Sequence, residues 1–145
     1  TLNGSEYPLV EFDFDEYSDS VYLKLEKLVA NGFTPIVAHP ERYSFVHEDD
    51  DAIRRIKNIG CLIQVNKGSL HGNFGRSAYR TSREIIINRQ ADFVASDAHS
   101  PYMRTPRLAD SHELVSELSS VDYAELIFRY NPFNVIRNKK ISSAE

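Results

Sequence analysis

The stretch Asp92-Phe93-Val94-Ala95-Ser96-Asp97-Ala98-His99 decides the fold class and points to the first candidate site. Its apolar run 93–95 predicts a short buried strand, and Asp97 and His99 follow directly. Because side chains of an extended strand alternate between two faces, these two residues are expected to point the same way. In a parallel sheet, the pair would lie at the carboxyl end of its strand, where α/β folds place their ligand sites.

Two further apolar runs lead into or contain potential metal ligands. The run 35–38 leads into His39, and the run 8–12 contains the carboxylate of Glu11. A carboxylate in an apolar strand is costly unless it is paired or binds a metal ion. Taken singly, each residue has an ordinary alternative, either a hydrogen-bonded structural histidine or an aspartate that caps a helix. Three strands that bring Glu11, His39, Asp97 and His99 to one rim favour a metal site.

The predicted ligands are carboxylates and imidazoles without a thiolate, which suits manganese, iron or zinc in a reactive site rather than a structural zinc cage. Such sites activate water and hold phosphoryl oxygens. Arg42 and Arg104 follow the two strand ends that carry histidine. A planar guanidinium there would grip a phosphate through two hydrogen bonds, although surface ion pairs are the alternative. For Arg107, at the start of a predicted helix, we prefer that alternative.

Strands and helices alternate along the chain, which predicts an α/β fold with a parallel sheet and right-handed crossovers. No repeat, linker or low-complexity run marks a boundary, so residues 1–145 are expected to form one domain. Four strand–helix units do not close a barrel, which needs about 200 residues or more. The fold is therefore either a small open sheet or most of a barrel that lacks its beginning. The expected strands are 10–14, 34–38, 61–66 and 91–95, and the expected helices are 18–30, 49–59, 77–89 and a helical stretch over 107–138 broken near 119–120 and 131–132.

Composition excludes several classes of protein. The 145 residues carry a formal net charge of −4, so no basic surface predicts nucleic-acid binding. A single cysteine, Cys61, rules out a disulfide framework and fits a reducing, cytoplasmic setting. No apolar run approaches the roughly 20 residues of a membrane span. A cysteine phosphatase is disfavoured too, because Cys61 precedes its strand and Lys67 stands six positions later, where such an enzyme needs arginine.

Several motifs together resemble a known family. They are Leu9-Val10-Glu11-Phe12, His39-Pro40-Glu41-Arg42-Tyr43, Ile63-Gln64-Val65-Asn66, Ser69-Leu70-His71-Gly72 and Ser96-Asp97-Ala98-His99. In this order they are similar to the metal-dependent protein tyrosine phosphatases of the PHP (polymerase and histidinol phosphatase) superfamily, which bacteria encode with capsular and exopolysaccharide genes. The resemblance runs over nearly the whole chain.

The resemblance implies a distorted (β/α) barrel with up to three manganese ions. By position, Glu11 is similar to the family's bridging carboxylate, and His39, Asp97 and His99 are similar to its other ligands. Arg42 and Arg104 are similar to its phosphate-binding arginines. The implied substrate is phosphotyrosine on a tyrosine kinase of polysaccharide synthesis, hydrolysed by metal-activated water.

Some family motifs do not occur in this sequence. The family begins with a strand containing His-x-His and an acidic segment, and neither is found here. The chain is therefore expected to be the carboxyl-terminal part of such a barrel, with its first strands missing and with weak or no activity alone. Two alternatives stay open: a phosphoesterase for a small ester such as histidinol phosphate, and a binding module without catalysis.

Overall fold

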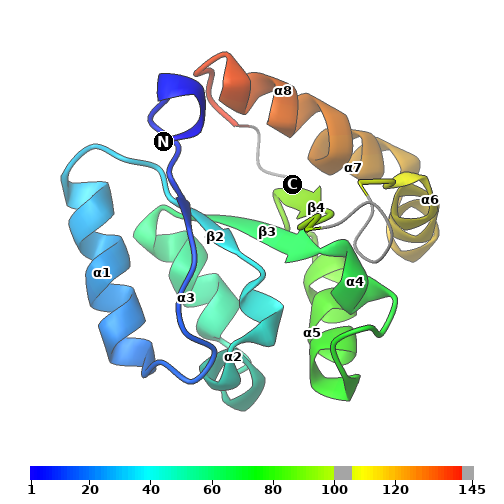
Figure 1. The fold of residues 1–145 in the computed structure, drawn as a ribbon, viewed down its shortest axis with the longest axis horizontal. Coiled ribbons are helices and arrows are strands. Elements are labelled where there is room, and N and C mark those ends of the chain that lie inside the picture. The colour runs from blue at the N-terminus through cyan, green and yellow to red at the C-terminus, as the bar shows by residue number, and fades with distance from the viewer. Residues whose placement is uncertain (100–105, 142–145) are drawn as a thin grey trace.

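Four parallel strands form the sheet of this protein, in the order β1-β2-β3-β4 (Figure 1). The computed structural model describes residues 1–99 and 106–141. The strands are β1 (Leu9–Val10), β2 (Ile36–Ala38), β3 (Leu62–Asn66) and β4 (Phe93–Ala95). Each strand pairs in parallel with the next one along the chain, which confirms the parallel sheet predicted from the sequence.

Helices connect the strands. The crossover from β1 to β2 is α1 (Ser18–Ala30), whose bounds agree with the sequence prediction. A 3₁₀ turn η2 (Pro40–Arg42), α2 (Ser44–Glu48) and α3 (Ala52–Ile59) lead to β3, and α4 (Lys67–Leu70) and α5 (Arg76–Ile87) lead to β4. Helix α3 ends at Gly60, whose φ of 107° is left-handed and costs glycine little.

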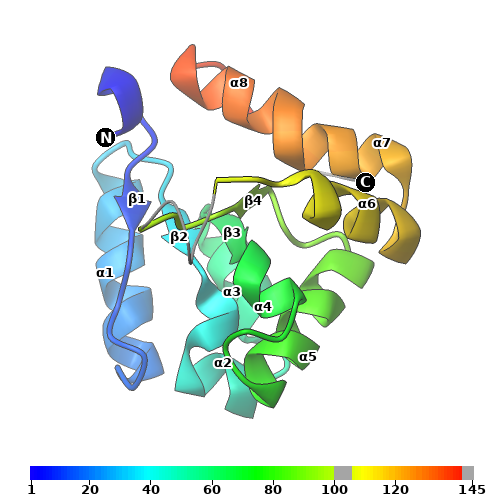
Figure 2. The same ribbon diagram turned by 45° about the vertical axis from the view of Figure 1, so that its right-hand side comes forward.

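The last part of the chain is helical and returns to the N-terminus. It consists of α6 (Ala109–Leu118), α7 (Val121–Glu125), a π-helical turn η3 (Leu126–Tyr130) and α8 (Asn131–Ile136). Figures 1 and 2 show α8 beside the first turn η1 (Leu2–Gly4). The side-chain amide of Asn3 donates to the carbonyl of Ile136 at 2.9 Å, which links these two segments.

Neighbouring strand residues point to opposite sides of the sheet, and apolar side chains cover both sides. Val37, Ile63 and Val94 belong to the main core, which packs against the helices between the strands. Ile36 and Phe93 belong to a smaller cluster on the other face, together with Val135 of α8. No helix in the described part of the chain is long and apolar enough to cross a membrane.

Several predicted elements differ from the structure: α2 was not predicted as a helix, and the helix expected over 49–59 begins at Ala52. The first strand stops at Val10 rather than continuing to residue 14. The segment between the strand expected over 61–66 and the helix expected over 77–89 begins with the short helix α4, because the side chain of Asn66 accepts the N–H of Gly68 and caps it. The predicted break at 119–120 is confirmed, whereas at 131–132 the backbone remains helical and only the hydrogen-bond pattern changes.

Candidate active site

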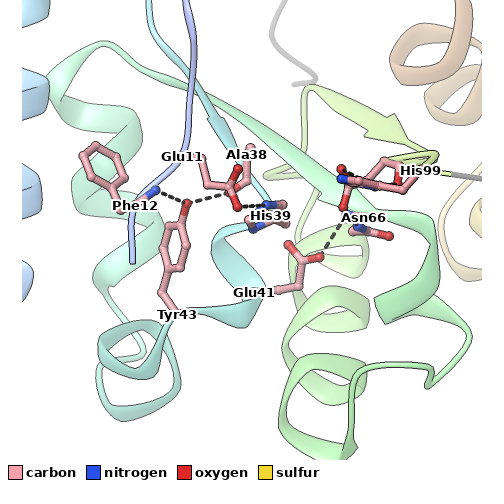
Figure 3. Close-up of polar contacts among 9 residues, drawn as sticks. Glu11, Phe12, Ala38, His39, Glu41, Tyr43, Asn66 and His99 are labelled. Carbon is pink, nitrogen blue, oxygen red and sulfur yellow. Dashed lines mark hydrogen bonds and ion pairs between the residues drawn. The ribbon is translucent and has the colours of Figure 1, made fainter. Parts of the chain in front are cut away.

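Glu11 and His39 form a pair at the carboxyl ends of β1 and β2 (Figure 3). Oε1 of Glu11 lies 3.1 Å from Nε2 of His39, with the histidine side chain 5% exposed and the glutamate 64% exposed. The hydroxyl of Tyr43 fixes this arrangement, because it donates to the carbonyl of Ala38 at 2.8 Å and accepts the N–H of Phe12 at 3.1 Å. Backbone groups that would extend the strand ladder are thus bound by a side chain, which explains why β1 ends at Val10.

Asp97 and His99 follow β4 as predicted, but strand alternation does not bring them together. The strand ends at Ala95, and Asp97 has a left-handed backbone with φ of 47°. His99 turns back so that its Nδ1 lies 2.7 Å from the carbonyl oxygen of Asp97 and 3.6 Å from its Oδ1. The expectation that both extend one face of a strand was wrong, because a left-handed residue ends the extended geometry.

The residues His39 and Asp97, which follow β2 and β4, both have a left-handed backbone conformation. His39 has φ of 37° and Asp97 has φ of 47°, and neither is glycine. Such conformations cost of order 1–3 kcal/mol each and tend to occur at functional sites, where the surrounding structure holds them. At His39 the next residue is Pro40, which starts the η2 turn and turns the chain away from the sheet.

Asn66, at the end of β3, binds Asp97 and Glu41, although the sequence did not place it among the predicted metal ligands. Its side-chain amide donates to Oδ2 of Asp97 at 3.2 Å, and its backbone N–H donates to Oε1 of Glu41 at 2.9 Å. The signal that could have found it is its place as the last residue of β3, between the ends of β2 and β4. Figure 3 shows Asn66 between the Glu11–His39 pair and His99.

Glu41 is the most buried charged side chain near this edge of the sheet, with no exposed surface. Burial raises the pKa of Glu41 to about 7, against the opposing effects of the Ser69 hydroxyl, the Asn66 N–H and the charge of Arg42. Its Oε2 has no hydrogen-bond partner among the described residues. Its role is to connect the turn after β2 with the end of β3.

The donor types at this edge suit a divalent metal ion. Glu11, His39, Asp97 and His99 offer carboxylate oxygens and imidazole nitrogens, and the buried Nδ1 of His39 has no hydrogen-bond partner among the described residues. The structure brings these residues together as two pairs. Over residues 1–99 and 106–141, no group of three or more histidine, cysteine, aspartate or glutamate side chains has the geometry to hold a metal ion.

Of the two predicted phosphate-binding arginines, the structure describes Arg42 but not Arg104. Arg42 lies at the end of η2, and its guanidinium carbon sits 4.4 Å from the ring centre of Phe14 and 4.0 Å from that of Phe74. The ring of Phe14 also contacts that of His39, with centres 5.7 Å apart. The ring of Phe14 therefore lies between Arg42 and the Glu11–His39 pair and contacts both Arg42 and His39. Arg104 lies outside the described residues.

Fold and site together define an α/β protein whose candidate site occupies the carboxyl edge of a parallel sheet. A family model described as capsular polysaccharide synthesis, CpsB/CapC, matches residues 1–137, so the chain belongs to the CpsB/CapC family. This confirms the family resemblance predicted from the sequence motifs.

Known relatives are tyrosine phosphatases by name. The chain is 27% identical over 146 residues to the tyrosine-protein phosphatase CpsB of Streptococcus agalactiae serotype V, covering 97% of this chain and 60% of that protein. It is 32% identical over 155 residues to the tyrosine-protein phosphatase YwqE of Bacillus subtilis, covering 96% of this chain and 60% of that protein. The chain thus spans about 60% of the length of these relatives.

A solved structure agrees in fold. It comes from a crystallographic study of YwqE from Bacillus subtilis and CpsB from Streptococcus pneumoniae, described as unique metal-dependent tyrosine phosphatases. It superposes with a TM-score of 0.90 at 26% sequence identity, covering 99% of this chain and 58% of that chain. The α/β fold predicted as part of a larger PHP-type fold is confirmed.

Proposed function

We propose that this protein takes part in metal-dependent hydrolysis of phosphotyrosine on proteins. Family membership and the metal-dependent tyrosine phosphatases among its relatives support the reaction class. The observation that carries the proposal within this chain is that two contacting pairs, Glu11 with His39 and Asn66 with Asp97, lie at the carboxyl ends of neighbouring parallel strands. The proposed setting is the cytoplasm, and the proposed substrate is a tyrosine kinase of polysaccharide synthesis.

We propose manganese as the cofactor, with iron and zinc as alternatives. Glu11, His39, Asp97 and His99 would hold it, through the oxygen and nitrogen donors of the two pairs. When bound, a divalent ion supplies a water nucleophile at neutral pH and stabilises negative charge on a phosphoryl group.

The chain's own residues have distinct tasks in this proposal. Asn66 holds the carboxylate of Asp97 in place through its amide, and Tyr43 holds the segment of Glu11 against the end of β2. Arg42 presents a guanidinium to the phosphate, with Arg104 proposed as a second one. Burial of His39 at 4% exposure keeps its ring in one orientation beside Glu11.

The proposal is tested by Asp97→Ala, with Asp122→Ala, an exposed aspartate of α7, as the matched control. Manganese content and hydrolysis of a phosphotyrosyl peptide are measured in the protein as its gene encodes it and in the 145-residue chain. We expect Asp97→Ala to lose metal and activity in the encoded protein, and Asp122→Ala to keep both. Normal manganese content and normal rate in Asp97→Ala would refute the site.

Arg42→Ala separates substrate binding from metal binding. We expect this variant to weaken the binding of phosphate and of phosphotyrosyl peptide more than the binding of manganese, because Arg42 offers no metal-binding atom. Comparison of rates on phosphotyrosyl peptide and on histidinol phosphate distinguishes a protein phosphatase from a phosphoesterase for small substrates.

A second candidate is a phosphate-binding module without catalysis. It is favoured by the absence of a group of three or more potential metal ligands within the described residues. In this case, the 145-residue chain binds manganese weakly and hydrolyses little, as the sequence also predicts. Rapid turnover of p-nitrophenyl phosphate by this chain, abolished by a chelator, would exclude this candidate.

A further inference from the structure

The guanidinium of Arg42 contacts two aromatic rings, those of Phe14 and Phe74. Its guanidinium carbon lies 4.4 Å from the ring centre of Phe14 and 4.0 Å from that of Phe74. The two rings come from different parts of the chain, Phe14 from the segment after β1 and Phe74 from the loop after α4. Together with Arg42 at the end of η2, they join the three loops that follow β1, β2 and β3. We call these three residues the arginine clamp.

The guanidinium of Arg42 makes no salt bridge and no side-chain hydrogen bond with any residue that the structure describes, although the residue is partly buried. An arginine has five N–H donors in one plane, and a carboxylate or another acceptor normally satisfies some of them. A cation over the face of a ring is attracted through its charge, so its N–H donors stay available for an acceptor. Contact with two rings therefore holds the charge in place without using its donors.

Nearby backbone holds the segment of Phe14 and packs against the ring of Phe74. The carbonyl of Phe14 accepts the N–H of Ser44 at 2.8 Å, which holds this segment against the start of α2. The ring of Phe74 lies on Gly68 of α4, where a Cβ would come within 2.6 Å of Cε2 of Phe74. Gly68 has no left-handed φ, so its backbone conformation does not require glycine, and the space for the Phe74 ring is what a side chain here would remove.

We infer that Phe14 and Phe74 are positioning residues that hold the guanidinium of Arg42 edge-on to an oxyanion ligand beside His39. The ligand class is a phosphate monoester dianion, and this inference rests on the proposed function. The position follows from Phe14, whose ring contacts both the guanidinium of Arg42 and the ring of His39. Removal of either ring lets Arg42 turn toward solvent, so that its donors must be ordered again whenever phosphate binds.

The test uses Phe74→Leu and Phe14→Leu, with Phe133→Leu as the matched control. Phe133 stacks on Arg137 at 4.1 Å in the same way, but on α8, away from the strand ends. The first measurement is the NMR signal of the Arg42 Nε–H, assigned by its loss in Arg42→Lys. Because ring currents act on a stacked guanidinium, we expect an upfield shift in the native chain that each clamp variant reduces and Phe133→Leu leaves unchanged.

The second measurement is the affinity for inorganic phosphate and for O-phosphotyrosine in the presence of manganese, by isothermal titration calorimetry of the same chain. We expect each clamp variant to raise the Kd about 2- to 30-fold, the range of a cation–π contact, and Phe133→Leu to leave it unchanged. Phe74→Tyr keeps the ring and is expected to restore both the chemical shift and the affinity. A variant that is merely less stable would not regain the Arg42 signal in this way.

The outcomes are separable. An Arg42 signal at the position of free arginine, or clamp variants that leave the signal and the affinity unchanged, would overturn the inference. A shifted signal in a chain that binds no phosphate would overturn it too, because the clamp would then serve no ligand. Phosphate affinity that depends on the clamp, without any hydrolysis, would support the clamp and count against the proposed function alone. Phe14 is 39% exposed, so its truncation tests the clamp even if Phe74→Leu does not fold.

Discussion

Glu41→Gln is expected to change how the stability of this protein depends on pH. The carboxyl of Glu41 is fully buried, and burial raises its pKa from the ordinary 4.5 to about 7. In the folded state the Glu41 carboxyl thus keeps its proton over a range of pH in which the same carboxyl of the unfolded chain has lost it. Stability contributed by this proton is complete below pH 4.5 and is lost as the pH rises to about 7.

The magnitude follows from the two pKa values. A difference of about 2.5 units at about 1.4 kcal/mol per unit corresponds to about 3 kcal/mol of unfolding free energy, lost between about pH 4.5 and pH 7. Glutamine at this position still accepts the N–H of Asn66 through its side-chain oxygen and carries no proton to lose. The variant should therefore gain stability relative to the native chain as the pH rises.

Urea unfolding of chelator-treated protein from about pH 5 to about pH 8 measures this effect. We expect the stability of Glu41→Gln minus that of the native chain to increase by up to about 3 kcal/mol over this range. Glu26→Gln, which makes the same change on the exposed side of α1, should follow the native profile. Parallel profiles for the native chain and Glu41→Gln would refute the reasoning that burial controls this carboxyl.

Further predictions concern three buried residues, Cys61, Gly68 and Asp92. Asp92→Ala should lower the unfolding free energy by about 3–5 kcal/mol in urea denaturation. The reason is that Oδ2 of Asp92 lies 2.7 Å from Nζ of Lys57 and that the Asp92 side chain is nearly fully buried. A loss of unfolding free energy under about 1 kcal/mol would contradict this prediction. Gly68→Ala should lower the unfolding free energy by about 1–3 kcal/mol in the native chain. In the Phe74→Leu background the loss should be clearly smaller, because the contact of 2.6 Å between the added Cβ and the Phe74 ring disappears. Equal losses in both backgrounds would show that Phe74 is not the obstacle. Cys61 should react with thiol reagents only at the rate of unfolding, since it is 3% exposed and burial raises its pKa to about 12; fast labelling of the folded chain would show that this part of the core opens.

Local patterns predicted most of the helices and the sheet because these elements depend on near neighbours in the sequence. Helix α1 was found at its observed bounds, since its apolar stripe and the Asn31-Gly32 stop lie within the segment itself. The parallel sheet followed from the alternation of apolar runs with helices. The length of β1 could not be predicted, because the N–H of Phe12 is bound by the hydroxyl of Tyr43, a residue 31 positions away.

The sequence by itself determined the candidate residues and their chemistry, because carboxylates, imidazoles and guanidinium groups keep their binding properties wherever they stand. Motif order also led from Glu11, His39 and Asp97 to the family. Only the tertiary structure decided how these groups meet: Asn66 links Asp97 to Glu41, and two phenylalanines from distant loops hold Arg42. Such contacts join segments far apart in the chain, so they arise from the packing of the whole sheet edge and leave no periodic signal in the sequence.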